Sequence, residues 1–335
     1  MMILIRRWLY AVVLLLMTTV AVAQSYDQQM RERVDSVLSA RYYKTPYDTN
    51  YVIRPEGRLT LKVRLNQSGN DFHTRGTVDG ADVRSDLRTS HKTTVAVAAI
   101  YRGLSAGLAV NPAKLGGFYK DYEMNFNYYS ASINVDASYQ RSTTLAGDIR
   151  LGDEISRIES GDLRMKILNV TGYYVFNKRQ FSYPAAFTQS YIQRRSAGSW
   201  LVGFSYQGGS LETTDELMER MPEANNARIY VGHVGLGGGY AYNWVVGKKW
   251  LFHFSMLPTL VVYNRNNITV DGERQKAGLT RFNMLFGERA AIVYNFSPRY
   301  FAGLTLTMNN SVFHDHVVTV NQNKWRFRAA FGLRL

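Results

Sequence analysis

The hydrophobic residues of this chain recur at every second position over most of its length, most clearly at the C-terminus. There, apolar side chains at positions 325, 327, 329, 331, 333 and 335 alternate with a register that contains Lys324, Arg326, Arg328 and Arg334. A period of two is the pattern of a β-strand with one apolar and one polar face. Because this strand is long enough to cross a bilayer at a tilt, it predicts a membrane-spanning strand.

The same alternation marks about twelve segments after residue 58, the C-terminal strand included. An even number of antiparallel strands that closes on itself returns both termini to the same side of a membrane. We therefore predict an all-β fold, a transmembrane antiparallel β-barrel of about twelve strands. The predicted strands cover 59–65, 93–100, 103–110, 122–128, 133–139, 163–176, 200–206, 230–242, 250–256, 281–295, 300–308 and 324–335.

The lengths of the connections support this order of strands, because bacterial barrels have short periplasmic turns and long outer loops. Odd-numbered connections such as 68–92 and 141–162 are long, and most even-numbered ones are tight. The even-numbered connection over 177–196 is long and aromatic instead, so either it folds back into the lumen or the strand count differs there. The first alternative predicts a plug that packs against the glycine-rich stretch 235–239. The candidate plug residues are Phe181, Tyr183, Phe187 and Tyr191.

Residues 1–57 precede the alternating pattern and divide into two parts. Arg6 and Arg7 lead into an apolar run over 8–22, and small residues at 21 and 23 come before Gln24. This arrangement predicts a secretory signal peptide that is cleaved after Ala23, and a single membrane anchor is the alternative. We expect a signal peptide at 1–23, a periplasmic lead-in at 24–57 and the barrel at 58–335, with export to the cell outer membrane.

The chain contains no cysteine, which excludes disulfides, thiolate metal sites and a cysteine nucleophile. Its formal net charge is +14, and loss of the two arginines of the signal peptide, a segment without acidic residues, lowers it to +12. This excess favours anionic partners, namely outer-membrane lipids, lipopolysaccharide and small anionic solutes. We expect no nucleic-acid partner, because an exported chain rarely meets nucleic acid and no helical basic stripe is present. As an outer-membrane barrel, the chain would also meet the barrel-assembly machinery.

Basic residues gather in the inward register of the first, tenth and twelfth predicted strands, and the first and last strands become neighbours on closure. Acidic residues such as Glu123 and Asp136 also point inward. Salt-bridge ladders across the lumen and an anion-selective lining are therefore alternatives. A barrel of about twelve strands is wider than the eight-stranded barrels that side chains fill and narrower than the sixteen-stranded barrels that leave an open channel. This intermediate size predicts a narrow or plugged pore. The basic lining candidates are Lys62, Arg64, Arg281, Arg289, Arg326 and Arg328.

Two further clusters resemble metal or catalytic sites, and each has a simpler interpretation. His314-Asp315-His316 could hold a transition metal, but it lies in a predicted exposed loop without a third histidine nearby. His233 and His253 fall in the inward register with Ser255 two residues on, as in a hydrolase, but no orienting acid is evident. We interpret these histidines as packed lumenal residues, and we expect no metal, no cofactor and no enzymatic activity.

Glu288 breaks the alternation, because it shares a register with Met284 and Phe286 and would face lipid. A charged side chain at the bilayer midplane is costly. We therefore expect a β-bulge at Gly287 that turns Glu288 inward beside Arg289.

Four stretches carry a family resemblance. They are Tyr47–Pro55 running into Arg58, Leu-Ser-Ala-Gly-Leu-Ala-Val-Asn-Pro at 104–112, the stretch 181–206 with Gln-Arg-Arg-Ser-Ala-Gly-Ser at 193–199, and Tyr-Asn-Phe at 294–296. Together they resemble an uncharacterised Bacteroidetes family of outer-membrane β-barrels, described only as a domain of unknown function. The resemblance covers nearly all of the mature chain and implies a barrel in the outer membrane. It implies no activity, substrate or catalytic residue.

Three functions fit these observations. The first is a porin-like narrow or plugged barrel that passes or binds small polar or anionic solutes. The second is a structural or adhesion barrel that acts through its long outer loops. The third, a barrel hydrolase, has the weakest support in the sequence. Ion conductance separates the first function from the other two, and turnover of lipid or peptide substrates is needed for the third.

Overall fold

The computed structural model describes residues 46–55, 59–78, 80–101, 104–111, 121–221, 226–276, 283–314 and 318–335. Residues 46–335 belong to one compact unit. The predicted signal peptide and most of the lead-in lie outside the described residues, so the division at residues 23 and 57 stays a prediction. No helix in the described part of the chain is both long and apolar enough to cross a membrane.

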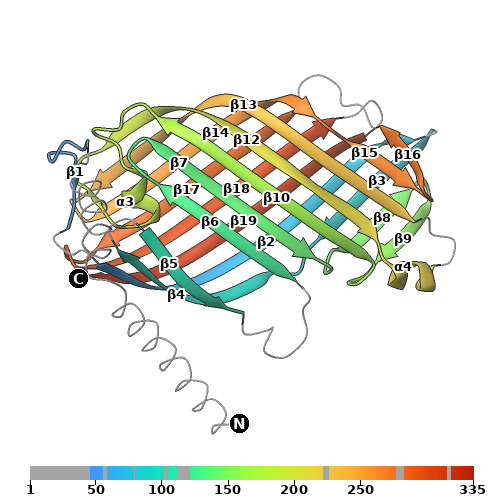
Figure 1. Ribbon diagram of the computed structural model, residues 1–335, viewed down its shortest axis with the longest axis horizontal. Coiled ribbons are helices and arrows are strands. Elements are labelled where there is room, and N and C mark those ends of the chain that lie inside the picture. The colour runs from blue at the N-terminus through green and yellow to red at the C-terminus, as the bar shows by residue number, and fades with distance from the viewer. Residues whose placement is uncertain are drawn as a thin grey trace, which may run out of the picture. The chain divides into compact units, whose positions relative to one another are not determined.

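Twelve antiparallel strands of the described residues form the wall of a barrel (Figure 1). In order around the wall they are β2 (Leu59–Val78), β4 (Lys92–Tyr101), β5 (Leu104–Val110), β6 (Tyr122–Tyr129), β7 (Ile133–Ser142), β10 (Leu163–Val175), β12 (Ala197–Thr213), β13 (Ala227–Val246), β14 (Trp250–Asn264), β17 (Met284–Asn295), β18 (Tyr300–His314) and β19 (Val318–Arg334). β2 and β19 pair from Thr60–Arg334 to Gly76–Val318, which joins the first strand to the last. The predicted fold class is confirmed.

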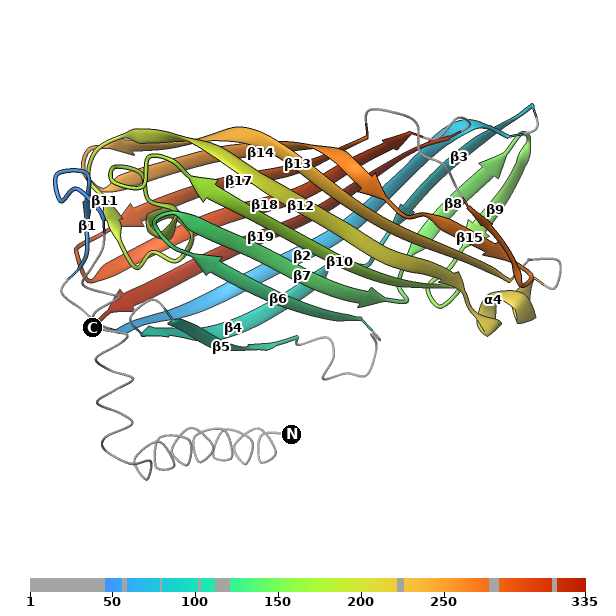
Figure 2. The same cartoon turned by 45° about the horizontal axis from the view of Figure 1, so that its top comes forward.

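Shorter strands extend the wall at the end away from the C-terminus, on the right of Figure 2. β3 (Ala81–Arg88) pairs with the far half of β2 and with β8 (Ala146–Leu151), and β8 pairs with β9 (Glu154–Ile158). We call residues 71–78 of β2 together with β3, β8 and β9 the distal sheet. β15 (Asn267–Val270) pairs with the start of β13 and with β16 (Glu273–Lys276). The connections 68–92, 141–162 and 264–280 thus contain strands of their own.

The outer face of the barrel is apolar, as the alternation requires. On β12, Trp200 is 69% exposed, whereas its neighbours Ser199 and Leu201 are 3% and 4% exposed. Phe126 on β6 and Phe254 on β14 are likewise more than half exposed. Soluble proteins rarely expose apolar belts of this kind, and lipid covers such a belt in transmembrane barrels.

The predicted β-bulge at Gly287 is wrong. β14 and β17 pair without a register shift, and a shift occurs instead between Val234 and Gly235 on β13. Glu288 therefore keeps the outward register, where Asn310 Nδ2 on β18 donates a hydrogen bond to its Oε2 at 3.1 Å. An amide on the neighbouring strand satisfies the carboxylate oxygen, so no extra residue is needed to turn the side chain.

Candidate functional site

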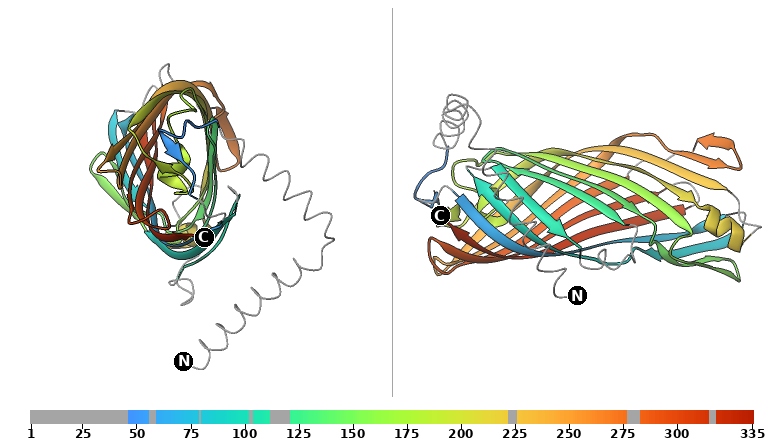
Figure 3. Two further views of the ribbon diagram at one scale, coloured as in Figure 1. Left: turned by 90° about the vertical axis from the view of Figure 1, so that its left-hand side faces the viewer. Right: turned by 60° about the horizontal axis from the view of Figure 1, so that its bottom comes forward.

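Residues 177–196 fold into the end of the barrel near the C-terminus (Figure 3, left). They contain the short helix α3 (Tyr183–Phe187), which contacts β6, β14, β17 and β18, strands from several sides of the wall. Phe181 and Tyr183 are 0% and 1% exposed. Of the two alternatives for this connection, the structure has the one in which it enters the lumen. We call residues 177–196 the plug.

Local sequence and one lysine of the wall hold α3 in place. Ser182 precedes the helix, and its Oγ accepts a hydrogen bond from Ala185 N at 3.3 Å, while Pro184 suits the first turn. At the other end, Lys62 Nζ on β2 donates to Thr188 O at 2.7 Å. A cation at a helix C-terminus satisfies a carbonyl that has no partner within the helix. The predicted lining residue Lys62 therefore binds the plug.

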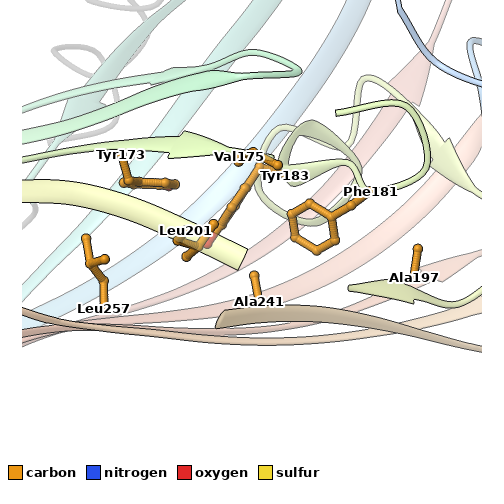
Figure 4. Close-up of a cluster of buried hydrophobic side chains, with 8 residues drawn as sticks. All are labelled: Tyr173, Val175, Phe181, Tyr183, Ala197, Leu201, Ala241 and Leu257. Carbon is orange, nitrogen blue, oxygen red and sulfur yellow. The ribbon is translucent and has the colours of Figure 1, made fainter. Parts of the chain in front are cut away.

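An apolar cluster surrounds the aromatic rings of the plug (Figure 4). The packing against the glycine-rich stretch stays a prediction, and the atoms nearest to a side chain at Gly237 or Gly239 belong to the backbone of β14. These glycines let neighbouring strands approach closely, and Ala241 is the small residue of β13 in the plug cluster. Besides Phe181 and Tyr183, the cluster contains Tyr173, Val175, Ala197, Leu201, Ala241 and Leu257.

The described end of the lead-in crosses the plug. β1 (Val52–Ile53) pairs antiparallel with β11 (Ile192–Gln193), and Arg54 Nη2 donates to the Tyr191 hydroxyl at 2.5 Å. Burial raises the pKa of Tyr191 above its ordinary value of 10.0, so this phenol stays neutral. Residues 46–55, which we call the clip, therefore fasten the plug through both backbone and side-chain hydrogen bonds.

Two buried carboxylates, Asp136 and Glu123, form ion pairs across the interior between the plug and the distal end. Arg289 Nε and Nη2 lie 3.0 and 2.7 Å from Asp136 Oδ2. Arg326 Nη2 lies 2.7 Å from Glu123 Oε1, and Lys324 Nζ lies 3.9 Å from the same oxygen. Paired charges of this kind are compensated within the protein. They fit the salt-bridge interpretation of the lumen better than an open anion-selective lining.

The other predicted lining residues differ in their surroundings. Arg328 Nη2 donates to Asn127 Oδ1 at 3.2 Å. Arg64 is half-buried and forms no ion pair with the described residues. Arg281 lies outside the described residues. Arg334, on the same strand as Arg328, donates from Nε to Gln189 O of the plug at 2.8 Å, so a second basic residue binds the plug.

Amides and a second apolar cluster fill the interior toward the distal end. Gln322 on β19 donates from Nε2 to Asn70 Oδ1 at 3.0 Å and accepts a hydrogen bond from Gln207. Beyond these amides, α4 (Asp215–Arg220) turns Leu217 into an apolar cluster beneath the distal sheet. The buried members of this cluster are Leu87, Leu145, Ile158, Leu163 and Leu217.

A small cavity lies in the ionic layer. The cavity beside Asp136, Arg289 and Arg326 has a volume of about 10 Å³, room for at most one water molecule. A larger hollow of about 360 Å³ lies against β8 and β9, outside the interior. The described side chains therefore form successive apolar, ionic, amide and apolar layers between the plug and the distal end.

The outward face of the distal sheet carries a row of three arginines. Arg75 is the register partner of Arg84, and Arg84 is the partner of Arg150. All three are exposed, and neither Arg75 nor Arg150 forms an ion pair with the described residues, while Arg84 has Asp82 at 4.0 Å. Like charges directly opposite each other on neighbouring strands are destabilising. We call these three residues the arginine row. Sequence reasoning missed it because the pairing of β3 with β8 has no sequence signature.

Next to the arginine row, this face carries cross-strand pairs that join a basic side chain to an acidic one. The His73 ring contacts the Asp86 carboxylate, and this hydrogen bond lowers the pKa of Asp86 below its ordinary value of 3.8. Arg88 Nε lies 3.9 Å from Asp71 Oδ1. Asp86 and Asp71 thus have His73 and Arg88 as their nearest partners, and Arg75 also helps to lower the pKa of Asp86 without forming an ion pair with it.

The remaining histidine candidates lie apart from one another. His314 Nδ1 lies 2.7 Å from Thr319 Oγ1, and Asp315 and His316 lie outside the described residues. Within the described part of the chain, no three His, Cys, Asp or Glu side chains are grouped as metal ligands. The ring of His233 packs against the ring of Phe313, and the two ring centroids lie 3.9 Å apart.

His253 has a partner that sequence reasoning missed. Its Nε2 lies 3.0 Å from Ser255 Oγ, and its Nδ1 lies 2.7 Å from Asn243 Oδ1 on β13. The sequence was examined for an acidic residue that could orient His253, and the amide of Asn243 was therefore overlooked. The available signal was the position of Asn243 in the inward register, directly opposite His253 in the pairing of β13 with β14.

Comparisons with known proteins give a family and distant structural likenesses. The family model described as "Domain of unknown function (DUF4421)" matches residues 46–334. Comparison with the curated proteins finds no match. Among solved structures, the outer membrane protease OmpT from Escherichia coli is 9% identical, with a TM-score of 0.39 over 84% of this chain and 97% of that one. The translocator domain of the autotransporter NalP from Neisseria meningitidis is 9% identical, with a TM-score of 0.30 over 95% and 98%. The toluene transporter TodX from Pseudomonas putida is 8% identical, with a TM-score of 0.27 over 87% and 93%. At such low TM-scores, the functions of these proteins do not bear on this chain.

Proposed function

Because this chain belongs to the family described as Domain of unknown function (DUF4421), its function has to come from its own residues, and we propose that it is a sealed outer-membrane barrel that binds anionic saccharide groups on its distal sheet. The proposed function combines two of the predicted ones: a plugged barrel that binds small anionic groups, and a barrel that acts through its long outer connections. An open pore is not part of the proposal.

The filled interior supports the sealed part of the proposal. A solute would have to displace the plug, the buried ion pairs of Asp136 and Glu123, the amide layer and the distal apolar cluster in turn. Opening the interior would separate the two charges of each buried ion pair. A buried charge without its counter-charge is strongly destabilising. The apolar belt supports placement in the outer membrane, because burial of that belt in lipid removes it from water.

The arginine row is the observation that carries the binding part of the proposal. Three guanidinium groups on adjacent strands repel one another, and a bound polyanion converts that repulsion into charge-assisted hydrogen bonds. Guanidinium groups match the planar carboxylates and the phosphates of acidic saccharides. Arg75, the member of the row on β2, lies ten residues beyond Leu65, a half-exposed residue of the apolar belt. We therefore propose the phosphate- and carboxylate-bearing core of lipopolysaccharide as the ligand.

Titration of the purified full-length barrel with lipopolysaccharide that retains its charged core tests this function. Replacement of Arg75, Arg84 and Arg150 together by Gln should lower the affinity, by about tenfold for each arginine that contacts the ligand. Arg88→Gln is the matched control, because Arg88 lies on the same face but next to Asp71. Equal affinity of the triple variant and the control would contradict the proposed binding surface.

A further inference from the structure

Three side chains beneath the plug are hydrogen-bonded in series. Ser255 Oγ lies 3.0 Å from His253 Nε2, and His253 Nδ1 lies 2.7 Å from Asn243 Oδ1. Ser255 and His253 share the inward face of β14, and Asn243 faces them from β13. All three are buried. Serine, histidine and a third group that orients the histidine form the set that nucleophilic acyl transfer requires.

The hydrogen bonds of Asn243 fix the direction of this series. Its Nδ2 donates to Ser182 O and to Gln193 Oε1, each at 3.0 Å, so its Oδ1 is the atom that faces His253. An amide oxygen only accepts, so His253 Nδ1 carries the proton and donates. His253 Nε2 is then the free acceptor, and the Ser255 hydroxyl donates to it. This is the proton arrangement in which a histidine acts as general base toward a serine.

The plug covers this series with aromatic rings. The centroids of Tyr183 and Phe187 both lie 5.0 Å from that of the His253 ring, and the Phe181 centroid lies 5.9 Å from it. The wall beside the series is apolar on one side, where Leu201 belongs to the apolar cluster (Figure 4). On the other side lies Arg289 of β17, the register partner of Ser255, which is paired with Asp136. If the rings of this short helix move aside, they leave a chamber next to Ser255 whose apolar side fits an extended acyl chain.

We propose that Ser255 is a concealed nucleophile for acyl esters with an apolar acyl chain, that His253 is its general base, and that Asn243 is the positioning residue. Ser255 Oγ forms a bond to the ester carbonyl carbon while its proton passes to His253 Nε2. The bond from that carbon to the leaving alkoxide oxygen then breaks, and the alkoxide takes the proton from His253. Water, deprotonated by His253, attacks the acyl-serine, and the carboxylic acid leaves as Ser255 regains its proton.

A fluorophosphonate probe tests this proposal on the full chain in detergent. Phe187→Ala and Tyr183→Ala each remove one covering ring, and heat-modifiable mobility shows whether each variant is folded. We expect the probe to label Ser255 in a folded cover variant, with the modified residue identified by mass spectrometry. Adding His253→Ala should slow labelling by about a hundredfold, and Ser255→Ala should abolish it.

Access to the site is measured separately, because the chain contains no cysteine. Ser255→Cys places a unique thiol at the site, and its alkylation rate in each cover variant reports opening. Ser205→Cys is the matched control, since Ser205 is a buried inward serine of β12. If His253 activates the nucleophile, His253→Ala should slow alkylation at 255, and Asn243→Ala should shift its pH profile, while neither should change alkylation at 205.

Two results would overturn the proposal. One is a folded cover variant in which the thiol at 255 reacts while Ser255 remains unlabelled, or is labelled equally without His253. The other is a thiol at 255 that stays unreactive in both folded cover variants and in the parent chain, because the site could then meet no substrate. In either case, the series of hydrogen bonds would serve only to hold the plug.

Discussion

Arg289 on β17 and Asp136 on β7 form an ion pair through the barrel interior, with Arg289 Nη2 2.7 Å from Asp136 Oδ2. Their strands are not neighbours in the wall, because β7 pairs with β6 and β10, and β17 pairs with β14 and β18. The contact therefore joins opposite parts of the barrel. It also occupies the layer through which any solute leaving the plug region would pass.

Loss of one partner of this ion pair should destabilise the barrel strongly. Asp136→Asn leaves the buried Arg289 guanidinium without its counter-charge, and such changes cost about 3–5 kcal/mol. Denaturant unfolding in detergent or lipid measures the loss. The double variant Asp136→Asn with Arg289→Gln should lose less than the sum of the two single changes. Additive losses would show that the two side chains do not depend on each other.

The direction of the side chains on β14 can be tested at Phe254, which is 61% exposed on the outer face. Phe254→Arg should destabilise the folded barrel in lipid by about 2–4 kcal/mol, because a cation then faces the bilayer. Phe254→Leu is the control, since it keeps an apolar side chain. Equal stability of the two variants in reversible unfolding would mean that this face does not contact lipid.

Lys62 should control how tightly the plug is held. Lys62→Met keeps most of the side-chain volume but removes the donor to Thr188 O and to Gln189 Oε1. We expect faster hydrogen exchange across residues 183–189, with strand exchange far from the plug unchanged. Lys178→Met is the matched control, because Lys178 is an exposed lysine of the same connection. Unchanged exchange in the Lys62 variant would mean that other contacts hold the plug.

Asp86 on the distal sheet should titrate below its ordinary value of 3.8, because the His73 ring hydrogen-bonds its carboxylate. A lowered folded-state pKa adds stability that is fully present above the unfolded pKa and is lost as the pH falls through the folded pKa. The distal sheet should therefore loosen only in acid below that ordinary value. Carboxyl NMR titration gives the midpoint, and His73→Phe should move it upward. A midpoint at or above 3.8 in the parent chain would contradict the contact.

The barrel was predictable because a half-buried strand alternates with a period of two, and nearly every strand of the wall has that pattern in its sequence. The segment 177–196 could be singled out by its length and its rings, since Phe181 and Tyr183 would be unfavourable on a wet surface. Its partners could not be predicted, because Lys62 and Arg334 reach it from strands far away in sequence. At Glu288, the free-energy cost of a charged side chain that faces lipid led to the prediction of a β-bulge. The structure instead has Asn310 on the neighbouring strand, whose amide donates a hydrogen bond to the Glu288 carboxylate.

The candidate sites depended on pairings that the sequence does not specify. The arginine row exists only because β3 pairs with both β2 and β8, which are joined through long connections. Asn243 becomes the partner of His253 through the register between β13 and β14, and a one-residue slip would turn it to the outer face. Alternation gives the face of each residue, but tertiary register decides which residues meet.

Conductance of the purified full-length barrel in planar lipid bilayers tests the sealed interior most directly. Insertion is verified independently by heat-modifiable mobility of the protein recovered from the same membranes. We predict that the inserted barrel gives no steady single-channel current, and that removal of plug residues 183–191 alone still gives none, because the ionic, amide and distal apolar layers stay in place. Stable, uniform current steps from the inserted parent chain would contradict a sealed barrel and restore the pore as its function.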